Sequence, residues 1–321
     1  MKKYGLCFSG GGGKGAYEIG VWKALKHLGK VFDITAVSGA SIGAVNGAFF
    51  AMGDYEKAEK VWNNISMADF FDIAADYRLS RDGLNEILNN SIDYEKIKFS
   101  PVKLYVNTSA VDESLNFPDL VEEVKPYARA HRDLLDERYY HVNDLGKEKI
   151  RQLLLASTAL PAVYPAVTID GEKMVDGGMT DNVPIRPLIE EAECSNLIVV
   201  MCGKDNEYDI YLASRCDEII EIRPSRNIGD LFDGTLDFNP ENVSFRVQLG
   251  FYDTLRVFDM LERKKMGIPY TAAEKMQSEK RDYDRIMAAV KADKAVNRIE
   301  SHRSQYDNLL KKYSDKYGID L

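Results

Sequence analysis

The chain has 321 residues, of which 45% are hydrophobic and 29% are charged, so it is long enough to bury a large core. Its net charge of −9 argues against a nucleic-acid partner, which would require a basic stripe. The same charge argues against purely electrostatic adhesion to anionic membranes, but it leaves transient contact through inserted apolar side chains open.

The cysteines, histidines and apolar runs predict a cytoplasmic protein without a metal site. Four cysteines form no CxxC pair, and Cys7 and Cys202 fall inside apolar runs, which favours small buried thiols. The four histidines are scattered, so no metal ligation is expected. The first residues are too polar for a secretory signal, and no run approaches the roughly 20 apolar residues of a membrane span.

The chain opens with a strand over residues 4–9, which leads into the glycine loop GGGGKG, Gly10 to Gly15. A helix with an apolar stripe follows from Ala16 to about Leu28, and a second strand begins at Ile34. Strand, helix and strand in this order predict a right-handed βαβ unit in a parallel sheet.

The glycine loop permits three functional interpretations besides a plain flexible turn. Gly10, Gly12 and Gly15 match the spacing of a dinucleotide fingerprint, but the acidic residue expected at the end of the second strand is missing there. A phosphate-binding P-loop requires Lys-Ser or Lys-Thr after its last glycine, where this chain has Ala16.

The third interpretation is an oxyanion hole, in which the main-chain N–H groups of Gly11, Gly12 and Gly13 point into one concavity. The second strand ends in Gly39-Ala40-Ser41-Ile42-Gly43, and a helix of small residues follows at once. A serine in Gly-x-Ser-x-Gly between strand and helix sits on a strained elbow, which predicts a nucleophile. Because consecutive βα turns of a parallel sheet meet at its C-terminal edge, the loop is expected to face Ser41.

The middle of the chain is less informative. Residues 54–89 are mostly helical in pattern, and Met67 to Asp72 within them fit either the mouth of a site or ordinary core. A strand is predicted over Val102 to Ala110, and residues 112–149 are polar without evident chemistry. A helix from Ile150 then runs into a rigid turn that contains two prolines.

Asp176-Gly177-Gly178 follows a short strand and is by itself only a turn signature. Two further strands are predicted, over residues 197–202 and 218–222. An amphipathic helix follows over Val243 to Arg263, and residues 272–317 read as a charge-rich covering helix or pair. We expect a core over residues 1–205, with residues 206–321 forming a strand and a helical cap packed on it.

Taken in order, the glycine loop, the serine elbow of Gly39 to Gly43 and Asp176-Gly177-Gly178 resemble the patatin-like phospholipase family. The Ala156 to Pro161 block and Asn182-Val183-Pro184 are similar to that family as well, and the resemblance extends over about residues 4–260. It implies a three-layer α/β/α fold with a mostly parallel central sheet and a helical C-terminal part.

The resemblance also implies a serine esterase or lipase that cleaves carboxylic esters of lipids or small alcohols and uses no cofactor. Ser41 would be the nucleophile and Asp176 the base, within about 2.6–3.2 Å of each other. The glycine-loop amides would form the oxyanion hole, and Lys14 would order the loop or attract a phosphate head group. Four consecutive glycines leave the identity of the oxyanion donors uncertain by one position.

Two kinds of alternative stay open. A Ser-His-Asp hydrolase needs a histidine after the acid, and the chain offers only His302 there, in its charged tail. A non-catalytic lipid-binding or nucleotide-binding protein of similar α/β fold would retain the same motifs without turnover.

Overall fold

The computed structural model describes residues 2–29, 32–65, 82–119, 121–203 and 206–317. Contacts divide the chain into two units, Met1–Tyr270 and Thr271–Leu321, which are described separately. The segment from Met67 to Asp72, for which the sequence allowed a lid or core, lies outside the described residues. The expected division of the chain at residues 205 and 206 stays a prediction.

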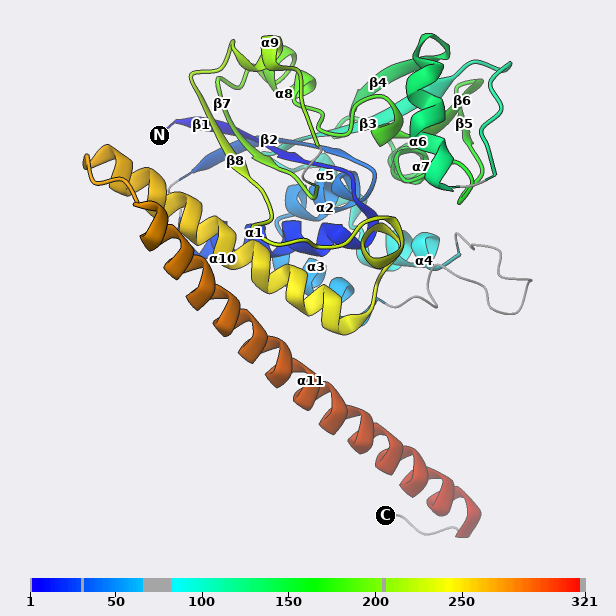
Figure 1. Ribbon diagram of the computed structural model, residues 1–321. Helices are drawn as coiled ribbons and strands as arrows, with labels where there is room; N and C mark the ends of the chain where they lie inside the picture. The colour runs from blue at the N-terminus through cyan, green and yellow to red at the C-terminus, as the bar shows by residue number, and fades with distance from the viewer. Residues whose placement is uncertain (1, 30–31, 66–81, 120, 204–205, 318–321) are drawn as a thin grey trace. The chain divides into compact units, whose positions relative to one another are not determined.

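One mixed sheet of eight strands forms the centre of the first unit (Figure 1). Its strand order is β5-β6-β3-β2-β1-β7-β8, and β4 pairs with β3 outside this path. The strands are β1 (Lys3–Phe8), β2 (Asp33–Ala40), β3 (Lys103–Val111), β4 (Leu135–His141), β5 (Val167–Ile169), β6 (Glu172–Asp176), β7 (Asn196–Val200) and β8 (Glu218–Ile222). Strands β3, β2, β1, β7 and β8 run parallel, whereas β4, β5 and β6 join antiparallel.

Helices cover both faces of this sheet, which confirms the predicted α/β/α architecture (Figure 1). Cys7 and Val199 pack with Leu188 on the face covered by the short helices α8 and α9, while the alternate residues Leu6 and Phe8 are buried on the other face. The helices of the first unit are α1 (Ala16–His27), α2 (Ile42–Ala51), α3 (Tyr55–Asn64), α4 (Asp82–Ser91), α5 (Tyr94–Lys98), α6 (Val121–Ala130), α7 (Lys147–Ser157), α8 (Arg186–Glu190), α9 (Ile210–Ala213) and α10 (Pro240–Lys265).

Residues 112–149, where the sequence showed no clear pattern, contain helix α6 and strand β4. The pattern of α6 is weak because Pro126 lies inside it and, of its described side chains, those of Val124 and Ala128 are the buried ones. β4 alternates poorly because six of its seven side chains are half-buried or exposed. The position of these elements is therefore determined by their packing against β3 and its neighbours.

Strand β3 brings the ends of β2 and β6 together. β4 pairs with Tyr105–Val111 along one edge of β3, so β2 and β6 share the other edge. Ala40, the last residue of β2, pairs with Asn107, and Asp176, the last residue of β6, pairs with Thr108. The two strands therefore run toward each other and meet end to end, which places Ser41 next to Asp176.

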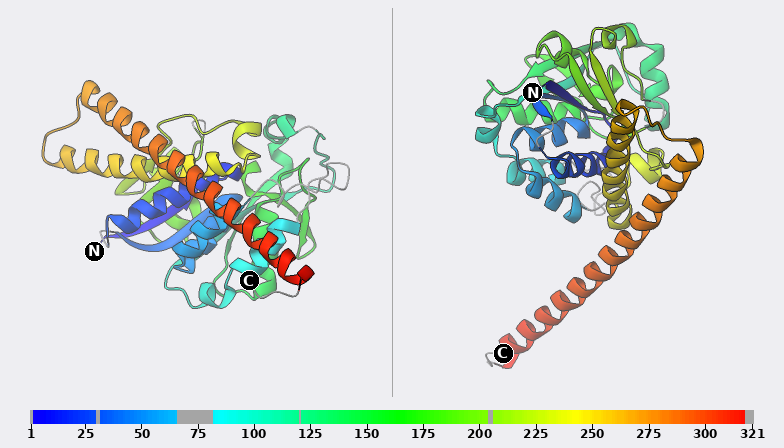
Figure 2. Two further views of the ribbon diagram at one scale, coloured as in Figure 1. Left: turned by 90° about the horizontal axis from the view of Figure 1, so that it is seen from below. Right: turned by 90° about the vertical axis from the view of Figure 1, so that its left-hand side faces the viewer.

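Helix α10 lies against α1, as Figures 1 and 2 show, and belongs to the first unit. The buried hydroxyl of Tyr17 on α1 donates to Asp253 on α10 at 3.1 Å. Asp253 in turn forms a short ion pair with Arg256. The predicted amphipathic helix over Val243 to Arg263 is therefore confirmed, and it anchors the end of the first unit to the first helix of the chain.

The described part of the second unit is one helix, α11 (Ala272–Tyr317), of 46 residues.

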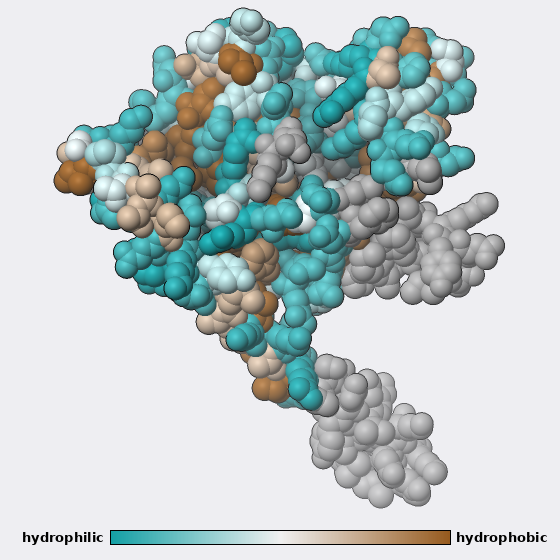
Figure 3. Space-filling model, in the orientation of Figure 1, coloured by the Kyte–Doolittle hydropathy of each residue, from teal (hydrophilic) through white to brown (hydrophobic). Residues whose placement is uncertain are grey.

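In the first unit, the short helix α9 carries the exposed apolar side chains of Ile210 and Tyr211. Figure 3 shows hydrophobic residues near α9 and at several other places on the same face. Within the described parts of the chain, no helix has the length and apolar character needed to cross a membrane.

Candidate active site

Ser41 occupies a sharp corner between β2 and α2. Its φ of 54° and ψ of −128° are unusual for a residue with a side chain, as expected for the strained elbow of a Gly-x-Ser-x-Gly motif. A Cβ atom added to Gly43 would lie 2.5 Å from the carbonyl oxygen of Phe8, so only glycine permits this close crossing of helix and strand.

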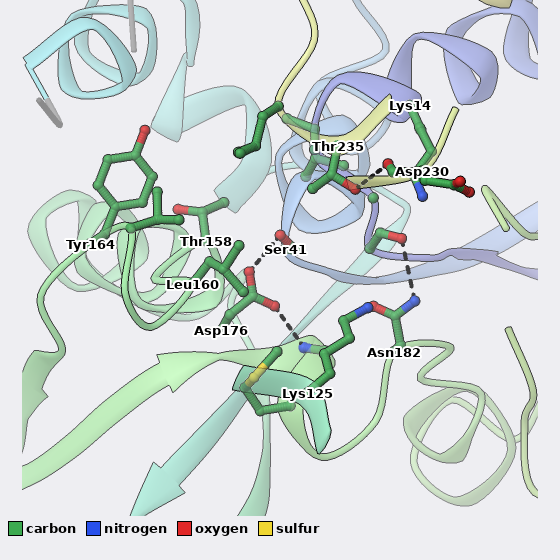
Figure 4. Close-up of a pocket in the computed structure, with 18 of the residues that line it drawn as sticks. Lys14, Ser41, Lys125, Thr158, Leu160, Tyr164, Asp176, Asn182, Asp230 and Thr235 are labelled. Carbon is green, nitrogen blue, oxygen red and sulfur yellow. Dashed lines mark hydrogen bonds between the residues drawn. The ribbon is translucent and has the colours of Figure 1, made fainter. Parts of the chain in front are cut away.

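Asp176 meets the serine at the end of β6. Ser41 Oγ donates to Asp176 Oδ2 at 2.6 Å, and the main-chain N–H of Gly178 donates to Asp176 Oδ1 at 2.8 Å (Figure 4). The distance from Ser41 lies within the range expected for a nucleophile and its base. The carboxylate is held by two donors and points its second oxygen at the hydroxyl.

The end of α7 fixes the main chain of both residues. The N–H of Ser41 donates to Ser157 Oγ at 2.9 Å, and the N–H of Asp176 donates to the carbonyl oxygen of Ala159 at 2.9 Å. Ser157 and Ala159 are fully buried. This finding gives a structural reason for the Ala156 to Pro161 block that the sequence singled out.

Burial changes the acid–base properties of Asp176, whose side chain is only 4% exposed. Loss of solvent raises the pKa of its carboxyl to about 6, against the opposing effect of the hydrogen bonds from Ser41 and Gly178. The pKa is therefore higher than that of an ordinary aspartate, which makes the carboxylate a stronger base, yet it still leaves the group ionised at neutral pH.

The glycine loop lies beside this pair. Gly10, Gly11 and Gly12 line the same cavity as Ser41 and Asp176, whereas Gly13 is buried behind them. The N–H of Gly10 is bonded to the carbonyl oxygen of Asn182 at 3.1 Å, and Asn182 Nδ2 returns a bond to the Gly10 oxygen at 3.3 Å. These bonds connect the loop to the residues that follow Asp176-Gly177-Gly178.

A buried arginine that the sequence analysis missed supports the loop from behind. Arg246 of α10 is 2% exposed and donates to the carbonyl oxygens of Gly13, Asp233 and Asp237 at 3.3, 2.8 and 2.7 Å. It also pairs with the Asp237 carboxylate at 2.9 Å. Arg246 lies three residues after Val243, on the apolar face of the helix. A charged residue at such a position is the sequence feature that could have indicated its burial.

The end of the turn Leu231–Thr235 and the residues just after it lie close to the loop. Gly12 has a φ of 55°, and a Cβ added there would lie 2.1 Å from the carbonyl oxygen of Thr235. A Cβ on Gly13 would lie 2.0 Å from the carbonyl oxygen of Asp237. The absence of side chains at these glycines therefore lets this segment pack closely against the loop, and it also leaves the main-chain N–H groups of the loop uncovered.

A second buried group that the sequence did not reveal lies under the loop. The Glu18 carboxyl accepts hydrogen bonds from Asn46 Nδ2 at 2.8 Å and from Cys202 Sγ at 3.3 Å. Burial raises its pKa to about 8, so this carboxyl is largely protonated at neutral pH. Asn46 also donates to the carbonyl oxygen of Gly15 at 3.1 Å, which links this neutral network to the end of the loop.

The cavity at Ser41 has a volume of about 370 Å³ and an apolar wall. Leu160 and Tyr164 lie on one side of the serine in Figure 4, and Thr235 and Lys14 lie on the other. Lys14 is half-buried, and loss of solvent lowers the pKa of its ammonium group. The remaining large apolar residues of the wall are Ile42, Leu84, Val163, Met179, Leu236 and Phe238.

No histidine lines the cavity in the described part of the chain. His131 and His141 are half-buried, and they lie in the region of α6 and β4. His302 belongs to α11 in the second unit. The hydroxyl of Ser41 is thus partnered by a carboxylate directly, which is the arrangement of a Ser-Asp pair.

A family model described as patatin-like phospholipase matches residues 6–189, which is more than half of the chain. The chain belongs to the patatin-like phospholipase family. The match includes the glycine loop, Ser41 and Asp176. The sequence-based recognition of this family is therefore confirmed.

Individual relatives of this patatin-like protein are distant. Lysophospholipase NTE1 of Kluyveromyces lactis is 25% identical over 212 residues, covering 62% of this chain and 12% of that protein. An uncharacterized NTE family protein of Mycobacterium tuberculosis is 26% identical over 184 residues, covering 57% of this chain and 44% of that protein. The chain thus spans less than half the length of these relatives.

Among solved structures, VipD from Legionella pneumophila is similar with a TM-score of 0.47 and 16% sequence identity. The match covers 81% of this chain and 67% of the VipD chain.

Proposed function

We propose that this patatin-like protein is a serine acyl hydrolase in which Ser41 is the nucleophile and Asp176 is its base. The 2.6 Å hydrogen bond from Ser41 Oγ to a buried carboxylate, at the mouth of an apolar cavity, carries the proposal. The strained main chain at Ser41 supports it, because strain of this kind concentrates where a structure must hold a reactive group in place.

In the first half of the reaction, Asp176 accepts the Ser41 proton as Oγ attacks the ester carbonyl carbon. Gly11 and Gly12 line the cavity, so their N–H groups are the proposed donors to the tetrahedral oxyanion, each contributing about 3–4 kcal/mol in comparable sites. Asp176 then returns the proton to the departing alcohol as the carbon–oxygen bond breaks. This sequence leaves an acyl group on Ser41.

In the second half, Asp176 removes a proton from water as the water oxygen attacks the acyl carbon. Asp176 then returns this proton to Ser41 Oγ as the bond between the acyl carbon and Oγ breaks, which releases a carboxylic acid and regenerates the free serine. Proton transfer from a serine hydroxyl to a carboxylate is unfavourable, and the raised pKa of Asp176 reduces this cost. The oxyanion donors therefore have to provide much of the stabilisation of the transition state. Lys14 is proposed to order the loop from its half-buried position.

The proposed substrates are acyl esters of lipids, because the cavity wall beside Ser41 is apolar. Its large apolar side chains would shield a bound acyl chain from water. Relatives named lysophospholipases support the same substrate class. Transient contact with a lipid surface through exposed residues such as Ile210 and Tyr211 is part of the proposal. A lipid-binding protein without turnover is the competing function.

Hydrolysis of medium-chain p-nitrophenyl esters and labelling by a fluorophosphonate test the proposal. Wild type should hydrolyse the esters and bind one equivalent of the label, whereas Ser41→Ala and Asp176→Asn should stay folded and lose ester hydrolysis. Ser114→Ala is a matched control, because Ser114 is exposed and lies outside the cavity. Full activity of Ser41→Ala would rule out Ser41 as the nucleophile, whereas a wild type that neither hydrolyses nor labels would favour the lipid-binding protein.

A further inference from the structure

A second cavity, of about 510 Å³, adjoins the one that contains Ser41. The two cavities share part of their lining, including Lys14, Lys125, Gly178 and Asn182. Gly178 is the residue whose N–H group holds Asp176. A molecule with its ester at Ser41 therefore reaches the second cavity over a short path.

The second cavity is basic in a protein whose net charge is −9. Its described lining contains five cationic side chains and two carboxylates. The cations are Lys14, Lys125, Arg129, Arg132 and Arg226, and the carboxylates are Glu207 and Asp230. Arg132 also pairs with Glu137, outside the lining, at 2.9 Å.

Lys125 of α6 connects the two cavities electrostatically. Its charge lowers the pKa of the Asp176 carboxyl and the pKa of the Lys14 ammonium, so it lies close enough for both groups to respond to it. Figure 4 shows Lys125 beside Asp176 and Asn182. A negative group bound near Lys125 would thus lie next to the proposed base without touching it.

Resting on the proposed function, we propose that the second cavity binds the phosphate of an anionic head group while the first holds the acyl chain. The substrate class is a glycerophospholipid or lysophospholipid whose head group carries no compensating cation. Guanidinium groups such as those of Arg129 and Arg226 suit phosphate, since they present paired N–H donors to its oxygens. A quaternary ammonium group would instead meet the same cations and be repelled.

The experiment compares lysophosphatidylglycerol with lysophosphatidylcholine of the same acyl chain, each in micelles of an uncharged detergent. Wild type should show the larger kcat/KM for lysophosphatidylglycerol, and added salt should reduce the difference. The double variant Arg129→Gln/Arg226→Gln should lower the ratio of the two kcat/KM values by about threefold or more.

The matched control is Lys103→Gln/Arg215→Gln, which removes the same charge at exposed positions outside both cavities. Its ratio should equal that of wild type, so a fall in both double variants would mean a general charge effect and would overturn the proposal. Equal kcat/KM values for the two lipids in wild type would overturn it as well, while p-nitrophenyl ester hydrolysis would leave the proposed function intact.

Inorganic phosphate distinguishes a head group from a free anion. Competitive inhibition of anionic-lipid hydrolysis by phosphate, together with the lipid preference, supports the head-group site. Inhibition by phosphate without any preference between the lipids would assign the cavity to free phosphate and overturn the proposal. A wild type inactive on every ester and unreactive with the fluorophosphonate would instead refute the proposed function itself.

Discussion

Arg246 on α10 donates to the main-chain oxygen of Gly13 at 3.3 Å, across 233 positions of the sequence. The same guanidinium holds the carbonyl oxygens of Asp233 and Asp237 and the Asp237 carboxylate. One buried side chain therefore ties the glycine loop to the segment that presses on it. Since the proposed oxyanion donors belong to that loop, we propose that Arg246 positions them.

Replacing Arg246 should impair turnover more than substrate binding. We expect Arg246→Ala to lose about 2–4 kcal/mol of stability, because it leaves several buried acceptors without a donor. At a temperature where the variant is folded, kcat should fall about tenfold or more with a smaller change in KM, and Arg246→Lys should recover part of kcat.

Arg256→Lys is the matched control for this prediction, because Arg256 is a buried arginine of the same helix that pairs with Asp253. It should lower the melting temperature with little effect on kcat. Equal losses of kcat in Arg246→Lys and Arg256→Lys would contradict a specific role of Arg246.

The pH dependence of hydrolysis should report Asp176. The base must be ionised to accept the Ser41 proton, and burial raises its pKa to about 6. The kcat/KM value should therefore be constant at higher pH and fall about tenfold per pH unit below about pH 6. A profile of p-nitrophenyl ester hydrolysis between pH 4.5 and 8, in the range where the fold is intact, measures this limb; a midpoint above pH 7 would point to another base.

The buried carboxylate of Asp176 should also destabilise the folded state. A carboxyl whose pKa is about 6 when folded and 3.8 when unfolded binds its proton more tightly in the folded state, so stability falls as pH rises between these values. The cost above pH 6 is at most about 3 kcal/mol, given about 1.4 kcal/mol per unit of pKa. Asp176→Asn should thus raise the free energy of unfolding at pH 8 while activity is lost.

Urea denaturation of Asp176→Asn and wild type at pH 8 and at pH 3.5 tests whether the variant has the higher free energy of unfolding. The stability difference should shrink at the lower pH, where the wild-type carboxyl is protonated in the folded state and mostly protonated in the unfolded state. A variant less stable than wild type at pH 8 would show that the hydrogen bonds of the carboxylate outweigh its burial.

Two glycines of α2 should respond oppositely to alanine. A Cβ at Gly43 would lie 2.5 Å from Phe8 O and 2.7 Å from Ser9 O, so Gly43→Ala must displace β1 and should destabilise by more than 2 kcal/mol, on the order of other overpacking changes. A Cβ at Gly47 meets only the flexible side chains of Leu104 and Val37, at 3.2 and 3.5 Å. Gly47→Ala should be neutral or stabilise by up to about 1 kcal/mol through helix propensity. Thermal unfolding of both variants tests the contrast.

The sequence predicted those parts of the fold that local patterns encode. The glycine loop and the serine elbow each follow a strand and precede a helix, so their order alone placed them at one edge of a parallel sheet. Asp176 was harder, because Asp-Gly-Gly is an ordinary turn and only the order of motifs distinguished it. The structure adds that Ser41 and Asp176 are hydrogen-bonded; their catalytic roles stay a proposal.

The features that the sequence did not predict all depend on distant partners. The role of Arg246 becomes evident only once Gly13 and Asp237 are known to lie beside it. The burial of Glu18 likewise becomes evident only once Asn46 and Cys202 are known to contact it. Strand β4 has no clear alternation of its own and forms along an edge that β3 provides. The basic cavity likewise gathers side chains from α6 and from the loop after β8, which no sequence pattern connects.

The end-to-end placement of β2 and β6 on one edge of β3 makes the separation of Ser41 and Asp176 a matter of strand register. A slip of one residue in the pairing of β6 with β3 would move Asp176 by about 3.4 Å and turn its side chain to the opposite face of the sheet. A single residue added inside β6 would alter that register. Loss of ester hydrolysis would therefore report a slip of a single residue in the pairing of these two strands.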